Sequence, residues 1–168
     1  MSSSVDPVGR VNGLAVKRAR RGPMRRLERV VLHKNIGLDG IATNSGNRQV
    51  ALIESEKWLE VQRELGAEIP WYERRANVLT AGIALKPLLG KRVRLGTAIV
   101  EIVGELTPCV RMREIHPGLL DALVPDFRGG VYARIIENGA VEVGAEITPL
   151  DGPRPSVETG GVSSSPSA

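Results

Sequence analysis

The sequence predicts a mainly β protein in which short strands form a closed or nearly closed β-barrel, with a few short helices beside it. Short runs rich in Val, Leu and Ile recur along the chain, separated by Gly, Pro, Asn and Asp. One long segment alone shows the 3.6-residue spacing of an amphipathic helix. Many short strands with little helix favour a barrel over a parallel α/β sheet. Because aromatic residues make up 3% of the chain, the core must be mainly aliphatic.

A single folded domain is predicted for residues 10–151, because a chain of 168 residues is large enough for one domain with its own core. Residues 1–9 are polar and are predicted to form a flexible N-terminus. Residues 152–168 are rich in Gly, Pro and Ser and hold almost no large apolar side chain. Burial cannot offset the entropy cost of ordering them, so they are predicted to form a disordered tail.

The strands are expected between clear turn signals. Arg21-Gly22-Pro23 predicts a turn after the first strand, and the unpatterned, glycine-punctuated segment 34–47 predicts a long loop. Asn138-Gly139 predicts a type I′ hairpin turn, which needs positive φ at both residues, between strands 131–137 and 140–143. In chain order the predicted strands are 11–17, 27–32, 48–53, 74–80, 92–95, 98–103, 131–137, 140–143 and 145–148.

The principal helix is predicted over residues 55–65. Ser55 is a suitable N-cap, the apolar stripe recurs at helical spacing, and Gly66 provides a stop. A short helical turn is expected over 85–90. A second short helix is expected over 117–123, opened by Pro117.

The net charge of +4 comes largely from one basic cluster near the N-terminus. Such a cluster permits a basic nucleic-acid-binding barrel. We favour a solvated strand edge instead, because no aromatic residues are interleaved for base stacking and cations on edge strands also discourage aggregation. Nucleic acid is therefore not the expected partner. The cluster consists of Lys17, Arg18, Arg20, Arg21, Arg25, Arg26 and Arg29.

Several classes of protein are excluded by what the sequence lacks. Gly90-Lys91-Arg92 has neither the glycine spacing nor the hydroxyl residue of a phosphate-binding Walker loop, and no dinucleotide fingerprint occurs. One Cys and two His give no zinc motif and no disulfide framework. Without an apolar run long enough for a bilayer, or a signal-peptide pattern, we expect a soluble, cytoplasmic protein that does not interact with membranes.

Cys109 is the leading candidate for chemistry. Pro108 before it predicts a strand end or loop, and if the chain stays extended, Arg111 and Arg113 lie on the side of the thiol. Nearby cations favour the reactive thiolate. The alternative is a buried cysteine that packs as a small apolar residue, and the sequence leaves both open. A catalytic pair of Cys109 with His116 also stays open, without a defined geometry.

Arg75 and Asn77 are candidates for binding an anion. Two residues apart on a predicted strand, they would face the same side, and a planar guanidinium can hold a phosphate through two parallel hydrogen bonds. The alternative is a surface arginine followed by an asparagine at a strand end. The residues alone do not decide between these.

An ordered set of short motifs resembles the MOSC domain, the module named for the C-terminus of molybdenum cofactor sulfurase. The opening strands with Gly22-Pro23-Met24 are similar to short, stand-alone bacterial members. The motifs span nearly the whole predicted domain, and in order they are Gly37-Leu38-Asp39-Gly40, Arg48-Gln49-Val50-Ala51-Leu52-Ile53, Arg75-Ala76-Asn77-Val78, Gly82, Leu88, Gly96, Pro108-Cys109, Gly130-Val131-Tyr132-Ala133-Arg134 and Asn138-Gly139 with Gly144.

The resemblance implies a β-barrel-like fold and a reactive cysteine at Cys109, which would carry sulfur as a persulfide or ligate molybdenum. It implies that Arg75 and Asn77 bind the phosphate of molybdopterin, the pterin part of the molybdenum cofactor. Further cofactor contacts that the resemblance implies are Arg48, Thr107 and Tyr132. At the level of the domain the resemblance also carries an association with pyridoxal phosphate.

The implied activity is that of a sulfur transferase or of a component of a molybdenum-dependent oxidoreductase, with a sulfur donor or a redox partner protein. The alternative to this implied activity is a non-catalytic module that binds a pterin or another phosphorylated ligand. One departure from the family pattern bears on the affinity for the cofactor. Ile41 and Ala145 stand where the family usually has acidic residues, so an acidic contact is expected to be absent.

Overall fold

The structure is a computed structural model and describes residues 9–17, 23–38 and 46–150. Its strands are β1 (Gly9–Lys17), β2 (Met24–Leu27), β3 (Arg29–His33), β4 (Gly37–Leu38), β5 (Val50–Glu54), β6 (Val78–Ala81), β7 (Arg92–Leu95), β8 (Ala98–Glu105), β9 (Val131–Glu137), β10 (Gly139–Glu142) and β11 (Glu146–Pro149). Its α-helices are α1 (Ser55–Leu65), α2 (Met112–Ile115) and α3 (Leu119–Leu123). Three 3₁₀ turns are η1 (Trp71–Arg74), η2 (Lys86–Leu88) and η3 (Pro125–Phe127).

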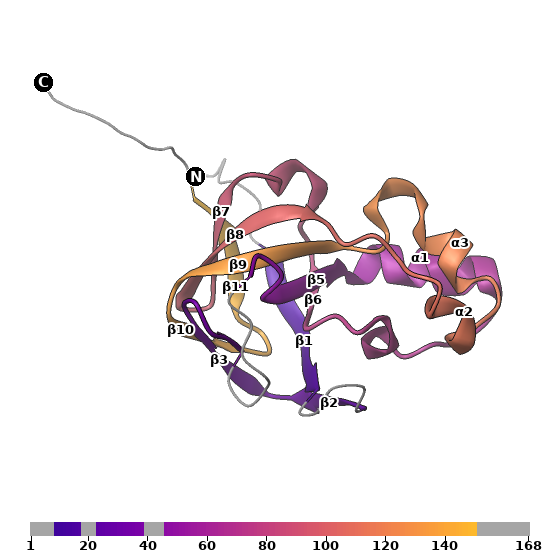
Figure 1. Cartoon of the computed structure of the whole chain (residues 1–168), viewed down its shortest axis with the longest axis horizontal. Coiled ribbons are helices and arrows are strands. Elements are labelled where there is room, and N and C mark those ends of the chain that lie inside the picture. The colour runs from indigo at the N-terminus through magenta and orange to yellow at the C-terminus, as the bar shows by residue number, and fades with distance from the viewer. Residues whose placement is uncertain (1–8, 18–22, 39–45, 151–168) are drawn as a thin grey trace, which may run out of the picture.

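Seven strands close into a barrel (Figure 1). They follow the order β11, β7, β8, β9, β5, β6, β1, and the first residues of β1 pair with β11, so that Gly9 lies opposite Ile147. The β2 strand extends the sheet outward from β1. The expected mainly β, barrel-forming fold is therefore confirmed.

A small second sheet of β10, β3 and β4 packs against the barrel, because Val30, Leu32 and Val141 belong to the same buried cluster as the barrel strands. It corrects the predicted hairpin, because β9 pairs with β5 and β8 whereas β10 pairs with β3. Asn138 and Gly139 are not among the described residues with positive φ, so no type I′ turn forms. The glycine is instead required by a close approach, since a Cβ on Gly139 would lie 2.4 Å from the backbone nitrogen of Ala98.

Two apolar cores lie on either side of β5. The barrel interior is filled by aliphatic side chains of the strands, among them Leu14, Leu52 and Ile102. The second core lies between the barrel and the helices, which gather at one end of the molecule (Figure 1) and contribute Trp58 and Met112. The aliphatic character of the barrel core agrees with the scarcity of aromatic residues.

Helix α1 matches its predicted limits. It ends where Gly66 adopts a left-handed conformation with φ of 63°. Its predicted N-cap is wrong, because β5 runs directly into the helix, Glu54 occupies the cap position and Ser55 is the first helical residue. The Glu54 carboxylate accepts a hydrogen bond from the Leu85 backbone N–H at 2.9 Å.

Other boundaries differ where tertiary contacts decide them. The predicted strand 27–32 is interrupted at Glu28 between β2 and β3, and the predicted strand 74–80 begins only at Val78. The short helix expected over 117–123 is present as α3, which begins at Leu119, and α2 precedes it where no helix was expected.

Parts of the sequence predictions lie outside the described residues. These are the predicted terminal segments apart from Gly9, the turn at Arg21-Gly22, and Asp39, Gly40 and Ile41 of the glycine motif. Of the basic cluster, Arg18, Arg20 and Arg21 also lie outside. Within the described ranges, no helix has the length and apolar character needed to cross a membrane.

Candidate functional site

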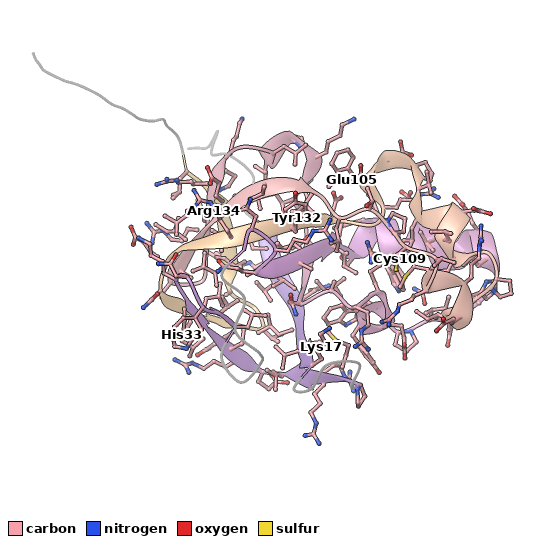
Figure 2. All side chains as sticks on the ribbon, viewed as in Figure 1. Lys17, His33, Glu105, Cys109, Tyr132 and Arg134 are labelled. Carbon is pink, nitrogen blue, oxygen red and sulfur yellow. The ribbon has the colours of Figure 1, made fainter. Side chains whose placement is uncertain are left out.

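Cys109 lies on an exposed turn where the barrel meets the helices (Figure 2). The chain leaves β8 at Glu105, and its backbone carbonyl at Cys109 accepts a hydrogen bond from the N–H of Met112 at 3.0 Å. Met112 is buried in the helical core, which anchors the far side of the turn. The buried alternative for the thiol is therefore wrong.

The predicted arrangement of cations around the thiol is also wrong. The chain does not continue as a strand, because Cys109 begins the turn into α2 and Arg111 is already in helical conformation. Strand alternation therefore does not place Arg111 and Arg113 beside the thiol. For Arg74, from a different part of the chain, the charge of Cys109 acts to raise the pKa of the guanidinium.

Arg74 is a buried arginine, with 5% of its surface exposed. Its Nε donates to the carbonyl of Gly129 at 3.1 Å, and its Nη2 donates to the carbonyl of Leu106 at 2.6 Å. Among the described residues no carboxylate pairs with it. A buried cation without an anionic partner is costly, so this position favours the approach of an anion.

The charge state of Arg74 depends on its surroundings. Burial lowers the pKa of its guanidinium to about 10, the Cys109 thiolate acts against this and raises the pKa, and the positive charge of Arg48 lowers it. Arg74 is therefore still protonated at neutral pH. Two cations thus act on one another beside a thiol, and an anion bound there would relieve their repulsion.

Glycine allows the loop that carries the thiol to pack tightly. The Leu106 N–H donates to the carbonyl of Gly130 at 2.8 Å. A Cβ on Gly129 would lie 2.7 Å from the Leu106 carbonyl oxygen and 3.2 Å from Nη2 of Arg74. Any side chain at position 129 would therefore push the loop or the guanidinium away.

Arg48 and Tyr132 lie against each other. The Arg48 guanidinium lies over the Tyr132 ring, 4.9 Å from its centroid, which is a cation–π arrangement. Tyr132 pairs with Ala51 of β5 and Gly104 of β8. A Cβ on Gly104 would lie 2.9 Å from the tyrosine hydroxyl, so the glycine makes room for the ring.

Asn77 has a structural use that explains its presence. Its Oδ1 accepts from the Ala51 N–H at 2.9 Å and its Nδ2 donates to the Ala15 carbonyl at 3.1 Å, so the side chain joins β5 to β1. Arg75 is not on a strand, because it caps η1 in a left-handed conformation with φ of 69°. The strand alternation behind the predicted clamp is therefore absent, and the phosphate-binding role of both residues stays a prediction.

The remaining candidates are placed as follows. Thr107 is exposed two residues before Cys109. His116 accepts a hydrogen bond at Nδ1 from the Gly118 N–H at 3.0 Å, and the described contacts do not join it to Cys109. Ala145 is partly buried against the barrel core. No group of three or more His, Cys, Asp or Glu residues suited to a metal ion occurs in the described ranges.

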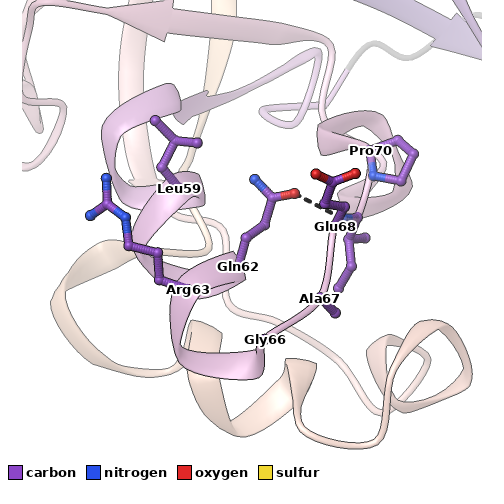
Figure 3. A pocket seen from close by; sticks show the side chains of 8 residues that line it. Leu59, Gln62, Arg63, Gly66, Ala67, Glu68 and Pro70 are labelled. Carbon is purple, nitrogen blue, oxygen red and sulfur yellow. Dashed lines mark hydrogen bonds between the residues drawn. The ribbon is translucent and has the colours of Figure 1, made fainter.

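A hollow elsewhere on the surface does not belong to this site. Figure 3 shows it between the C-terminal half of α1 and the segment 66–70, where the Gln62 side chain accepts a hydrogen bond from the Ile69 N–H at 2.8 Å. Leu59 lines it and is half exposed. None of the residues around Cys109 lines this hollow.

The sequence predictions missed Arg74. The sequence marks this position only by the pair Arg74-Arg75, in which Arg75, and not Arg74, lies two residues before Asn77. Burial of the first arginine depends on carbonyl groups contributed by residues 106 and 129, which are distant in sequence.

Solved structures with the same fold support the barrel assignment. The YuaD protein of Bacillus subtilis superposes with a TM-score of 0.71 at 20% identity, covering 83% of this chain and 94% of that protein. YiiM of Geobacillus stearothermophilus superposes with a TM-score of 0.66 at 16% identity, covering 85% of this chain and 75% of that protein. YiiM of Escherichia coli superposes with a TM-score of 0.66 at 16% identity, covering 84% of this chain and 70% of that protein.

The sequence comparisons identify the family. No curated protein matches the chain significantly. The family model described as the MOSC domain matches residues 31–148, which include β5, the segment with Arg74, and Cys109. The match spans well over half of the sequence, and the chain therefore belongs to the MOSC domain family.

Proposed function

We propose that this protein binds the molybdenum cofactor beside Cys109, with the thiol as the group that ligates molybdenum or carries sulfur. The observation that carries the proposal is an exposed thiol on a loop whose backbone binds the buried guanidinium of Arg74, which no carboxylate pairs with among the described residues. The MOSC family association with this cofactor gives the ligand its chemical identity.

The residues present fit such a group. A thiolate is a soft ligand suited to molybdenum and sulfur chemistry. Arg74 and Arg48 provide positive charge for an anionic ligand, and the Tyr132 ring gives an apolar face beside Arg48. When bound, the cofactor would supply a redox-active metal.

The other residues would bind and orient. Arg75 is the proposed phosphate ligand because its guanidinium can donate two parallel hydrogen bonds, and Thr107 lies on the same loop as the thiol. Asn77 would act mainly by keeping β5 in register with β1, with any phosphate contact added to its two backbone hydrogen bonds. Arg48 and Tyr132 would form the adjoining wall.

The sulfur-carrier form of the proposal uses the same thiol. The Cys109 thiolate would attack the outer sulfur of a persulfide on a donor protein, forming a new S–S bond as the donor's S–S bond breaks. The donor leaves as a thiolate, and Cys109 holds the transferred sulfur with its proton. Because the thiol is exposed, a protein donor can reach it without unfolding the domain.

Molybdenum content and oxidised-pterin fluorescence test the proposal, measured on protein from a host that makes the cofactor. The wild type should contain both, and Cys109→Ser should fold normally but lose molybdenum or cyanide-labile sulfur. Arg134→Met is the matched control, because Arg134 pairs with Glu101 on the barrel surface and should not alter loading.

Two other outcomes separate the alternatives. Pterin at wild-type level in Cys109→Ser, with no metal or labile sulfur in either protein, would favour a non-catalytic binding module. A wild type without molybdenum, pterin or labile sulfur would contradict the proposed function.

A further inference from the structure

The turn that carries Cys109 presents an apolar side chain to the surface in an ordered backbone. Val110 is 65% exposed, more than any other large hydrophobic residue among those described. Its carbonyl accepts a hydrogen bond from the Arg113 N–H at 3.0 Å, and Met112 between them is buried in the helical core. Contact with another molecule would therefore not require this turn to become ordered first.

Unpaired arginines follow the valine on the same turn. Arg111 and Arg113 are both exposed, and among the described residues no carboxylate pairs with either of them. One exposed apolar side chain is ordinary on a protein surface. An apolar side chain flanked by arginines is instead typical of protein interfaces, where arginine is enriched and a polar rim surrounds an apolar centre.

The positive charge continues from the thiol loop across η1 to β2. Arg74 of η1 binds the Leu106 carbonyl of the thiol loop, and Arg75 follows at the end of η1. The same short helix touches β2, because the Arg26 guanidinium lies 5.8 Å from the centroid of the Tyr72 ring. The 3₁₀ turn thus connects two sets of exposed arginines into one surface.

This surface, here called the basic face, carries more positive than negative charge. The acidic residues in the same segments are Glu73 and Glu114, both exposed. A partner that covers the basic face with complementary charge must therefore supply carboxylates of its own. The basic face consists of Arg25, Arg26, Arg75, Arg111 and Arg113, with Val110 beside the thiol.

We propose that the basic face docks an acidic partner protein that brings a reactive sulfur to Cys109. The arginines orient the partner by pairing with its carboxylates, and Val110 packs against an apolar side chain at the centre of the contact. The inference rests on the proposed function in taking Cys109 as the group that exchanges sulfur. It adds the charge of the partner and the residues that select it.

Other occupants fit the basic face less well. A second copy of the chain that presented the same surface would bring like charges together, which costs free energy at an interface. Nucleic acid would match the charge with its phosphates, but it would leave the apolar Val110 and the thiol beside it without a use. An acidic protein accounts for the charge, the exposed valine and the thiol together.

The test is the rate at which Cys109 of the ligand-free protein exchanges with peptides of different charge at one neutral pH. Each peptide holds a central cysteine as a pyridyl disulfide, flanked by glutamates, glutamines or lysines. The Cys109 thiolate attacks the peptide sulfur, so that a new S–S bond forms as the bond to the pyridyl sulfur breaks. The leaving thiolate takes up a proton as thiopyridone, whose absorbance gives the rate.

The acidic peptide should react about tenfold faster than the neutral one at low salt, and the basic peptide more slowly than both. The preference should shrink at high salt, because ions screen exposed charges. Comparing two peptides at one pH cancels the thiolate fraction of Cys109, so the ratio reports docking. A leucine beside the cysteine of the acidic peptide should add a further gain of about threefold through Val110.

Substitutions locate the effect on the surface. Arg111→Gln combined with Arg113→Gln should lower the acidic-to-neutral ratio by about threefold or more. The matched control is Arg92→Gln with Arg94→Gln, which removes the same charge from exposed positions of β7, at the other end of the molecule from α2 (Figure 1), and should keep the wild-type ratio. Val110→Ser should remove only the gain from leucine. Urea unfolding checks that each variant is folded.

Equal rates for the acidic and neutral peptides would overturn the proposal. So would an equal fall of the ratio in the variant pair on the turn and in the control pair on β7, because net charge alone would then explain it. Submicromolar binding of a mixed-sequence polynucleotide at physiological salt, lost in the variant pair on the turn, would assign the basic face to nucleic acid and overturn a protein partner. These readouts use ligand-free protein, so a wild type without molybdenum, pterin or labile sulfur would contradict the proposed function without changing the peptide preference.

Discussion

The buried guanidinium of Arg74 donates a hydrogen bond from Nη2 to the main-chain carbonyl of Leu106 at 2.6 Å, three residues before Cys109. Its Nε reaches the carbonyl of Gly129. One side chain thus links η1 to the thiol loop and to the residues before β9. The position of the Cys109 loop therefore depends on this buried guanidinium.

Arg74→Lys should weaken cofactor retention although it keeps the charge, because an ammonium cannot reach both carbonyls with the planar geometry of the guanidinium. Loss of one hydrogen bond from a charged donor, ~1.5 kcal/mol, corresponds to roughly tenfold weaker retention. Arg74→Met should retain still less cofactor than Arg74→Lys. Molybdenum content after dialysis measures this, and retention equal to wild type in both variants would remove Arg74 from the site.

Gly129→Ala should slow native-state alkylation of Cys109 and lower stability. The added methyl group would lie 2.7 Å from the Leu106 carbonyl oxygen, a backbone atom that cannot move alone. Gly118→Ala is the matched control, because its Cβ would meet the flexible end of Leu65 at 2.8 Å. Equal behaviour of the two variants would show that the 106–109 loop does not need this close packing.

The stabilising effect of Glu64 should disappear in acid. Its hydrogen bond from Arg128 holds the pKa of the Glu64 carboxyl below its usual range. Because the folded-state pKa is the lower one, the stabilisation is present above the unfolded-state pKa and is lost as pH falls through the folded-state value. Glu64 is exposed, so the effect is small.

Thermal unfolding of wild type and Glu64→Gln measures this effect. The wild type should melt higher at pH 7, and the difference should vanish in strong acid. Glu60→Gln should show a smaller difference, because Glu60 makes one longer contact with Arg128, at 3.4 Å. A difference that is independent of pH would contradict an ionic contribution from Glu64.

Asn77→Ala should destabilise the fold by about 1–3 kcal/mol, because it leaves the Ala51 N–H and the Ala15 carbonyl without their partner. Urea unfolding measures this loss of stability. Asn12→Ala is the control, since Asn12 is exposed on β1. If Asn77→Ala lost the cofactor at unchanged stability, Asn77 would act as a ligand more than as a link between strands.

Much of the fold was predictable from local signals. The apolar stripe and Gly66 define α1, and alternating aliphatic runs define strands such as β7 and β9. The hairpin turn predicted from Asn138-Gly139 is wrong. Gly139 is required because Ala98 of another strand approaches it closely, and no local sequence pattern reveals this contact. Turn propensity alone cannot distinguish a hairpin from a crossing between sheets.

The site was predictable in part. Pro108 predicted that Cys109 lies at a strand end or in a loop, which the structure shows, but the sequence left open whether the thiol is exposed or buried. Extension past the proline would have placed Arg111 and Arg113 beside the thiol, whereas burial of Met112 turns the chain into α2. The role of Arg74 depends on carbonyls that only the closed barrel brings together.

Alkylation of Cys109 in the native protein, with and without bound cofactor, tests the proposed site most directly. The ligand-free wild type should react with iodoacetamide well before it unfolds, because the thiol is exposed. Cofactor-loaded protein should be protected, since the ligand would cover or bond the sulfur. A thiol that reacts equally fast in loaded and ligand-free protein, or that stays unlabelled until the domain unfolds, would contradict a cofactor site at Cys109.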